Sequence, residues 1–172
     1  MDFSGSGQIE YHKNVSNNAS VPDYIRITEE WGGLRECSCG VFAFTNEGCN
    51  TAGRTQHAGG KFLLALDIDA NGVADLLFSE SGCDSLYLFT NDGTTENAIF
   101  STATVFPSNN ASKGLYPTAF YEDVDFDNTK DLLLSYGVFE RTDEITDFST
   151  SLRFFKNDGT TTQPQFSTTP FS

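Results

Sequence analysis

The sequence predicts an all-β protein built from antiparallel, four-stranded meanders. A nine-residue acidic loop occurs twice, at 67–75 and 123–131, and each copy lies between short apolar runs. A second shared segment, which contains Asn-Asp-Gly, follows each loop at 85–95 and 151–161. No long segment keeps apolar residues at the 3.6-residue spacing of a helix, so we expect little helix.

Each acidic loop carries oxygen-bearing side chains at its first, third, fifth and ninth positions, and a backbone carbonyl at the seventh could complete the set. Ca²⁺ accepts about six to eight oxygen ligands in a flexible geometry, and crowded carboxylates repel one another unless a cation neutralises them. We therefore predict two structural Ca²⁺ ions, one in each loop. The expected ligands are Asp67, Asp69, Asn71, Val73 and Asp75 in the first loop and Asp123, Asp125, Asp127, Thr129 and Asp131 in the second.

These loops differ from an EF-hand, in which a bidentate Glu stands at position 12. Phe78 and Leu134 occupy that position here, and the apolar residues on both sides favour a loop that joins two strands. The sixth position must turn sharply, and it holds Gly72 in one copy and Asn128 in the other, the residues that best tolerate a left-handed backbone. The alternative is a pair of acidic hairpin turns without metal.

The segment after each loop reads SLYLFTNDGTT at 85–95 and SLRFFKNDGTT at 151–161. Asn-Asp-Gly is a strong signal for a hairpin turn. A degenerate copy near the N-terminus, QIEYHKNVSNN at 8–18, keeps the apolar spacing and the aligned Asn. The aromatic residues that follow the three copies, and that mark one further strand in each, are Tyr24, Phe100 and Phe166.

Four-stranded meanders that repeat at this length are the blades of β-propellers. The chain accounts for about two and a half blades, whereas a closed propeller has about four to eight. We therefore expect the remainder of a larger polypeptide, or further copies of this chain, to complete the propeller. The predicted divisions are a partial repeat at 1–27, a Cys-containing insertion at 28–59, a second repeat at 60–104 and a third at 105–172.

The two loops with their flanks, ALDIDANGVADLLFS and YEDVDFDNTKDLLLS, resemble the FG-GAP or VCBS repeats of integrin-alpha-like β-propellers. The tetrapeptide HAGG before the first loop, together with NDGTT, is similar to large secreted surface proteins of Bacteroidetes that are exported by the type IX pathway. The resemblance covers 57–172 well and 8–27 weakly, and it implies structural calcium and an adhesive or carbohydrate-related role. The departures from the family pattern are Ala70 in the first loop and Asn128 and Thr129 in the second. They make the second loop the weaker expected calcium site.

The four cysteines predict two disulfides. Cys37 and Cys39 are too close in sequence to pair easily, so we expect Cys49 and Cys83 each to bond to one of them. Disulfides and calcium belong to the same compartment, which favours an extracellular or cell-surface location. The alternatives are a zinc site, although Cys-x-Cys lacks the paired spacing of zinc modules, and free buried thiols.

Charge and composition argue against several classes of protein. A net charge of −14 without a basic patch speaks against a nucleic-acid partner. The chain contains no run of about 18 apolar residues, so we expect no membrane span. The N-terminus lacks the basic and apolar parts of a secretion signal, so we expect a piece of a longer secreted protein. The histidines His12 and His57 stand outside any recognisable catalytic motif, which favours a non-catalytic protein.

Two insertions, at 28–56 and 137–150, interrupt the repeats, and a meander would bring both to the end opposite the metal loops. They hold the candidate ligand-face residues Trp31, Arg35, Glu140 and Arg141, because aromatic residues and Arg dominate binding hot spots. Trp31 could equally cover a small core of its insertion. We expect a calcium-binding, non-catalytic segment that serves adhesion or binds a carbohydrate or protein. The alternatives are the propeller of a secreted polysaccharide-degrading enzyme and a purely structural spacer.

Overall fold

The strands of this chain form antiparallel sheets, as the sequence predicts. The computed structural model describes residues 2–3, 8–18, 20–45, 47–49, 60–108, 115–137 and 151–166. Within these ranges the chain is all-β, no sheet closes on itself, and no helix has the length and apolar character needed to cross a membrane. The chain divides into two compact units: the first unit comprises 1–56 and 91–101, and the second unit comprises 57–90 and 102–172.

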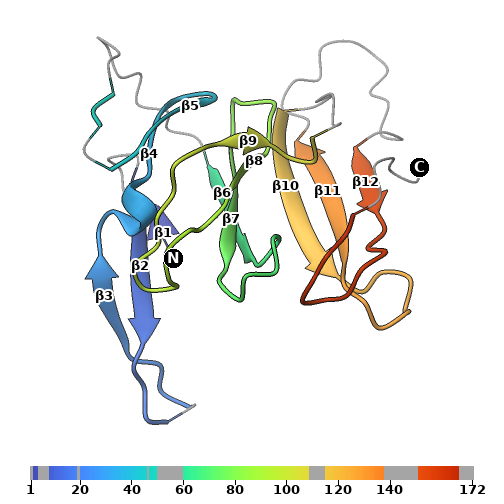
Figure 1. Ribbon diagram of the computed structural model, residues 1–172, viewed down its shortest axis with the longest axis horizontal. Coiled ribbons are helices and arrows are strands. Elements are labelled where there is room, and N and C mark those ends of the chain that lie inside the picture. The colour runs from blue at the N-terminus through green and yellow to red at the C-terminus, as the bar shows by residue number, and fades with distance from the viewer. Residues whose placement is uncertain are drawn as a thin grey trace. The chain divides into compact units, whose positions relative to one another are not determined.

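The first unit contains a three-stranded sheet in the order β1-β2-β3 (Figure 1). β1 (Asp2–Phe3) pairs with β2 (Ile9–Asn14), which pairs with β3 (Tyr24–Thr28). The register places Asn14 opposite Tyr24, which confirms the predicted strand at this aromatic residue. The sequence predicts two strands in this partial repeat, and the third arises because the N-terminal residues of β1 pair with β2.

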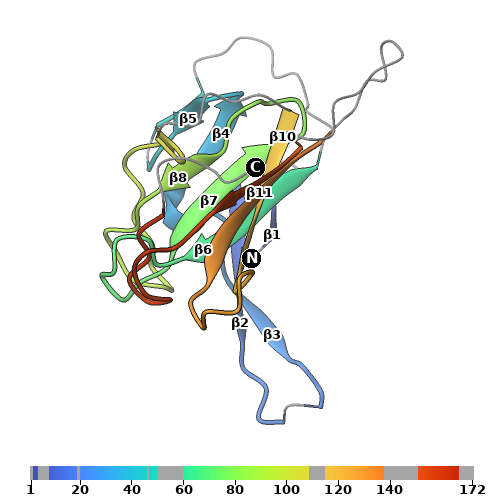
Figure 2. The ribbon, with the colours of Figure 1, turned by 90° about the vertical axis from the view of Figure 1, so that its right-hand side faces the viewer.

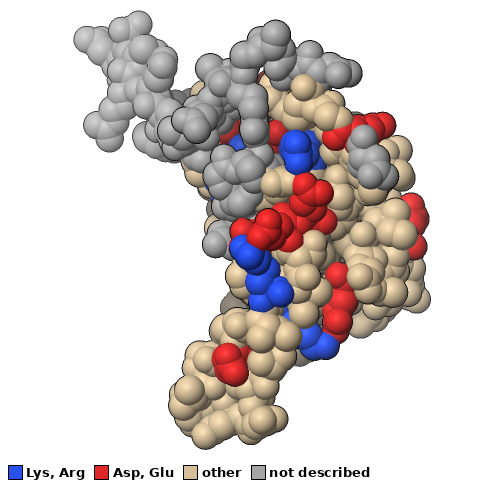
Figure 3. Space-filling model, turned by 90° about the vertical axis from the view of Figure 1, so that its left-hand side faces the viewer, with Lys and Arg blue, Asp and Glu red and all other residues tan. Residues whose placement is uncertain are grey.

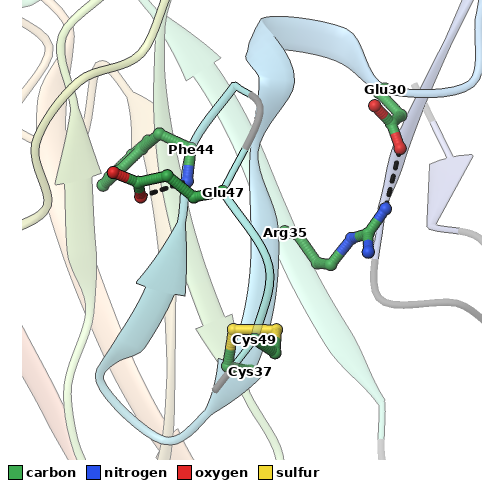
Figure 4. The surroundings of a disulfide bond; sticks show 6 residues. All are labelled: Glu30, Arg35, Cys37, Phe44, Glu47 and Cys49. Carbon is green, nitrogen blue, oxygen red and sulfur yellow. Dashed lines mark hydrogen bonds and ion pairs between the residues drawn. A yellow bond between two sulfur atoms is a disulfide. The ribbon is translucent and has the colours of Figure 1, made fainter.

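The Cys-containing insertion belongs to the first unit and forms a short turn and a hairpin. The 3₁₀ turn η1 (Trp31–Gly33) precedes a hairpin of β4 (Arg35–Ser38) and β5 (Val41–Ala43). A disulfide joins Cys37 to Cys49, with 5.4 Å between the two Cα atoms (Figure 4).

The other two cysteines, Cys39 and Cys83, are also disulfide-bonded, so no cysteine is free. The prediction of two disulfides is therefore confirmed, and the alternatives of a cysteine zinc site and of free thiols are wrong.

The second repeat forms a four-stranded sheet in the second unit. Its strands are β6 (Lys61–Leu66), β7 (Asp75–Glu80), β8 (Tyr87–Phe89) and β9 (Thr104–Val105), and their spatial order follows the chain. The first acidic loop joins β6 to β7 (Figure 1). Every residue of β7 is buried, because this strand lies inside the sheet between β6 and β8. This is the meander that the repeat predicts.

The third repeat has the same order. β10 (Leu115–Glu122), β11 (Asp131–Gly137) and β12 (Leu152–Phe155) form a three-stranded sheet, and the second acidic loop joins β10 to β11 (Figure 2). A bridge between Asn157 and Phe166 stands where the sequence predicts the fourth strand. Among the described residues, which end at 166 in this repeat, the bridge represents the fourth strand.

The core of the second unit contains apolar side chains from both of its sheets. The two sheets also bond directly, since the N–H of Tyr116 donates to the carbonyl of Cys83 at 2.8 Å and the Ser79 hydroxyl donates to the carbonyl of Pro117. The two repeats thus pack as neighbouring sheets. The buried members of the cluster are Leu77, Leu86, Ala119, Leu132, Leu134, Tyr136 and Phe155.

One predicted strand is wrong. The sequence predicts a strand at Phe100, but the last strand of the second repeat is β9, at Thr104–Val105. The segment 91–101 belongs to the first unit, where the Phe100 ring meets Trp31 edge-on with 5.1 Å between centroids. The Phe100 ring is 2% exposed. Burial of the ring, rather than pairing with β8, therefore stabilises the position of this residue.

Candidate metal-binding loops

The first acidic loop brings three predicted ligands together. One carboxylate oxygen from each of Asp67, Asp69 and Asp75 lies within 4.8 Å of the other two. Asp75 is the first residue of the buried strand β7 and is itself 0% exposed. Its Oδ2 accepts the backbone N–H of Ile68 at 2.8 Å, so the ninth residue of the loop fixes the second.

Backbone N–H groups fold the rest of the first loop around its first residue. Asp67 accepts the N–H of Asn71 at Oδ1 (3.1 Å) and the N–H of Gly72 at Oδ2 (2.9 Å). The Asn71 side chain accepts the N–H of Val73 at 2.7 Å and donates to Asp69 Oδ2 at 3.1 Å. The loop is therefore held in one conformation by its own carboxylates and amide.

The second acidic loop repeats the backbone N–H bonds of the first loop position by position. Its three grouped carboxylates are those of Asp123, Asp125 and Asp127. Asp123 accepts two N–H groups, from Asp127 at 3.2 Å and from the sixth residue, Asn128, at 3.0 Å. Thr129 donates its N–H to Asp127 Oδ1 at 2.8 Å.

The ninth residue of the second loop is a predicted ligand, but it is not one of the three grouped carboxylates of this loop. Asp131, 0% exposed at the start of β11, accepts the N–H of Val124 at 3.2 Å and that of Asn157 at 2.9 Å. The second bond ties the second acidic loop to the Asn-Asp-Gly turn, so these two features lie at the same end of the third repeat, as the meander predicts. The backbone carbonyls of Val73 and Thr129 stay predicted ligands, and their N–H groups help to shape the loops.

Both loops adopt a left-handed backbone at the same two positions. At the sixth position φ is +85° for Gly72 and +70° for Asn128, which confirms the predicted sharp turn. At the fourth position φ is +62° for both Ala70 and Phe126, which the sequence did not indicate. A bulky residue rarely adopts this conformation, and Phe126 does so with 87% of its surface exposed.

A lysine that the sequence analysis did not single out contacts the second loop. Lys156 donates from Nζ to Asp127 Oδ2 at 2.7 Å and also donates to Asp125 Oδ2. The aligned residue in the first repeat is Thr90, which has no charge. A position-by-position comparison of SLYLFTNDGTT with SLRFFKNDGTT contains this signal.

These contacts perturb the acid-base behaviour of both partners. The hydrogen bonds with Asp125 and Asp127 raise the pKa of Lys156 above its usual range. The hydrogen bond from Lys156, followed by that from the N–H of Thr129, lowers the pKa of Asp127. Both shifts favour the charged forms, so an ammonium and a carboxylate face each other in the second loop.

The donor set fits a hard divalent cation. The clustered atoms are carboxylate oxygens, which Ca²⁺ and Mg²⁺ prefer over the nitrogen and sulfur ligands of zinc. Ca²⁺ tolerates a more varied ligand geometry than Mg²⁺ and keeps fewer of its own water molecules. The residues present, among them the grouped carboxylates of Asp67, Asp69 and Asp75, therefore fit calcium.

The expected ligand-face residues have different surroundings. The expectation of an exposed Trp31 is wrong: it is 1% exposed, its ring stacks on Tyr11 with 6.1 Å between centroids, and Nε1 donates to the carbonyl of Thr95 at 2.8 Å. Trp31 is instead a core residue of the first unit, which was the alternative interpretation. Arg35 is at the surface and pairs with Glu30 at 2.8 Å (Figure 4).

Three residues with predicted or weighed roles, Glu140, Arg141 and His57, lie outside the described residues. Of the four ligand-face candidates, the structure thus leaves Arg35 as the one that is described and partly exposed. On the face shown in Figure 3, acidic and basic side chains lie next to one another among uncharged ones.

Comparisons with protein-family models, with curated proteins and with solved structures found no match to this chain. The residues and their geometry therefore carry the functional argument.

Proposed function

We propose that this chain is a calcium-stabilised, non-catalytic β-propeller segment of an extracellular or cell-surface protein, where it serves adhesion or ligand binding. The observation that carries the proposal is the duplicated acidic loop. Two loops that differ in most of their residues share one frame of backbone hydrogen bonds and one pair of left-handed positions. Each also groups three carboxylates, at positions one, three and nine in the first loop and at positions one, three and five in the second. A common ligand is the simplest reason for both loops to keep this frame.

Calcium also accounts for the position of each loop within its repeat. Each loop ends at a buried Asp that begins an inner strand, Asp75 in β7 and Asp131 in β11. A cation held by three carboxylates would fix the end of the hairpin and relieve the repulsion between them. Calcium is thus proposed as a structural ion that stabilises the repeat rather than as a catalytic one.

Two disulfides support the proposed location. Disulfides persist in oxidising, extracellular-type compartments, where calcium is also abundant enough to fill sites of moderate affinity. The resemblance to FG-GAP or VCBS repeats agrees with this location and with a role in adhesion.

An unpaired edge supports the proposal that further polypeptide completes the propeller. β3 is the last strand of its sheet among the described residues, and Tyr24, Ile25 and Ile27 on it are 58%, 48% and 37% exposed. Exposed apolar residues on a sheet edge favour association with another strand. A longer chain or a second copy would cover them.

The proposal is tested by thermal unfolding of the 172-residue chain in CaCl₂ and in excess chelator. A ligand present at about 100 times its Kd adds about 2.7 kcal/mol to stability, so we expect chelation to lower Tm by several degrees. Asp67→Ala should remove part of this difference, because it deletes the carboxylate that organises the first loop and leaves the second loop intact. Glu29→Ala, which removes an exposed carboxylate paired with Arg26 outside both loops, should leave it unchanged.

An identical Tm with and without calcium would sink the calcium proposal and favour two acidic turns without metal. A shift of equal size in MgCl₂ would keep a cation site but reject calcium selectivity.

A further inference from the structure

We infer that Lys156 is an internal cation of the second loop, so that the two loops differ in affinity and the chain binds one Ca²⁺ tightly and a second one weakly. This inference rests on the proposed function and concerns how the two sites share it. Its basis is the residue that follows the third strand of each repeat, which differs between the repeats although the backbone hydrogen bonds of the two loops match.

The strand register brings the two aligned residues to the same place. Phe89 pairs with Leu76 in the second repeat, and Phe155 pairs with Leu132 in the third. The next residue along the chain is therefore level with the ninth position of the loop in both repeats. This residue is Thr90 in the second repeat and Lys156 in the third.

The Lys156 ammonium binds oxygens that a metal ion would use. In Asp125 and Asp127, Oδ1 accepts a backbone N–H, and Oδ2 accepts Nζ of Lys156. In the first loop, Oδ2 of the aligned third residue, Asp69, accepts the neutral amide of Asn71. A cation that enters the second loop must therefore displace a charged donor, which forms a stronger hydrogen bond than a neutral one.

The side chains at the fifth loop position and at the end of the strand differ together between the repeats. The second repeat has the neutral pair Asn71 and Thr90, and the third has the charged pair Asp127 and Lys156. Lys156 also contacts Asp125, so it does more than neutralise the additional carboxylate. All three charged side chains are about one-third exposed, so the ammonium can leave when a divalent cation is concentrated enough.

Calorimetry with CaCl₂ tests the second loop by itself in an Asp67→Ala background, in which the first loop is disabled. Lys156→Thr gives the third repeat the residue of the second, and we expect it to raise calcium affinity in this background at least about tenfold, since displacement of a charged hydrogen-bond donor is no longer needed. The control is Lys130→Thr, because Lys130 lies in the same loop but bonds to Glu122 and to the carbonyl of Tyr121 rather than to the grouped carboxylates. It should change the affinity far less.

A comparison of Tm values in chelator tests the Lys156 contacts independently of metal binding. In chelator, Lys156→Thr should lower Tm more than Lys130→Thr does, because it leaves Asp125 and Asp127 without their shared cation. Equal affinities for Asp67→Ala with and without Lys156→Thr, or an equal gain from Lys130→Thr, would overturn the inference and leave calcium binding intact. If the parent chain binds no calcium in either loop, the proposed function fails and the affinity difference fails with it.

Discussion

Asn157 fixes the turn at the end of the third repeat with both ends of its side chain. Its Oδ1 accepts the N–H of Gly159 at 3.0 Å and of Gln165 at 2.8 Å, while Nδ2 donates to the carbonyls of Lys130 and Thr160 at 2.8 and 3.0 Å. The residue is 2% exposed, so its amide satisfies groups that water cannot reach. This explains why an Asn begins the motif in each repeat.

Asn91 has the same role in the second repeat. Its Oδ1 accepts the N–H of Gly93 at 3.0 Å and of Ile99 at 3.1 Å, and it is 1% exposed. The glycine two residues later is needed for a different reason, which is space. A Cβ on Gly93 would lie 2.2 Å from the carbonyl oxygen of Asn97, and one on Gly159 would lie 2.3 Å from that of Gln163.

We therefore predict that Gly159→Ala destabilises the protein by about 1–3 kcal/mol, the range for a side chain forced into occupied space. The atom that it meets is a backbone oxygen, which cannot move away as a flexible side chain can. Equilibrium urea unfolding gives the change in free energy. The matched control is Gly48→Ala, where an added Cβ has no neighbour within 4 Å and the expected change is below about 0.5 kcal/mol. Equal effects of the two substitutions would contradict this account of the turn.

Much of the fold could be predicted from sequence because its inner strands have a clear apolar pattern. The runs after Asp75 and Asp131 are apolar throughout, which is typical of strands inside a sheet, and β7 and β11 are the inner strands of their sheets. The repeated spacing then indicated the meander and the two acidic loops. Local sequence was sufficient here because each repeat forms its own antiparallel pairs.

Elements outside the repeat could not be predicted in the same way. Trp31 and Phe100 meet across a large distance in sequence, and neither residue has a local pattern that indicates this contact. The bond from Lys156 to the second loop likewise depends on the register of β12 with β11. Comparison of the repeats predicts the features that the copies share. The Lys156 contact arises at a position where the copies differ, and Trp31 lies in an insertion that has no counterpart in the other repeats.

The disulfide between Cys37 and Cys49, which are 12 positions apart, joins β4 to the residues that follow β5. Few residues of the β4-β5 hairpin are buried, so we predict that the double substitution Cys37→Ser/Cys49→Ser lowers the free energy of unfolding by about 2–3 kcal/mol. Urea unfolding measures the loss, and peptide mass spectrometry under non-reducing conditions should find no free thiol in the parent chain.

The control for this hairpin is Arg35→Gln, which breaks the ion pair with Glu30 and leaves the disulfide in place (Figure 4). Both partners are partly or largely exposed, and such pairs contribute about 0–1 kcal/mol. If the cysteine substitutions cost no more than Arg35→Gln, the hairpin does not depend on its disulfide.

At the scale of the whole chain, the proposed ion sites and the described disulfide hairpin belong to different compact units. Both acidic loops lie in the second unit, whereas Cys37 and Cys49 lie in the first. Stability is seldom uniform across a protein, and parts of a chain open separately according to their own contacts. Calcium is therefore expected to act mainly on the strands that border its loops.

Hydrogen exchange of backbone amides, followed by mass spectrometry with and without chelator, measures this directly. We predict that removal of calcium speeds exchange in β6, β7, β10 and β11, because their hairpin ends lose the ion that holds the carboxylates together. Exchange in β2 and β3, which pair with each other in the first unit, should change little. Asp67→Ala should reproduce the effect of chelator on β6 and β7 alone, since the loop at 123–131 is intact in that variant. Faster exchange throughout both units on chelation would show instead that calcium stabilises the chain as one cooperative body, and the assignment of its effect to the two loop-bearing hairpins would be wrong.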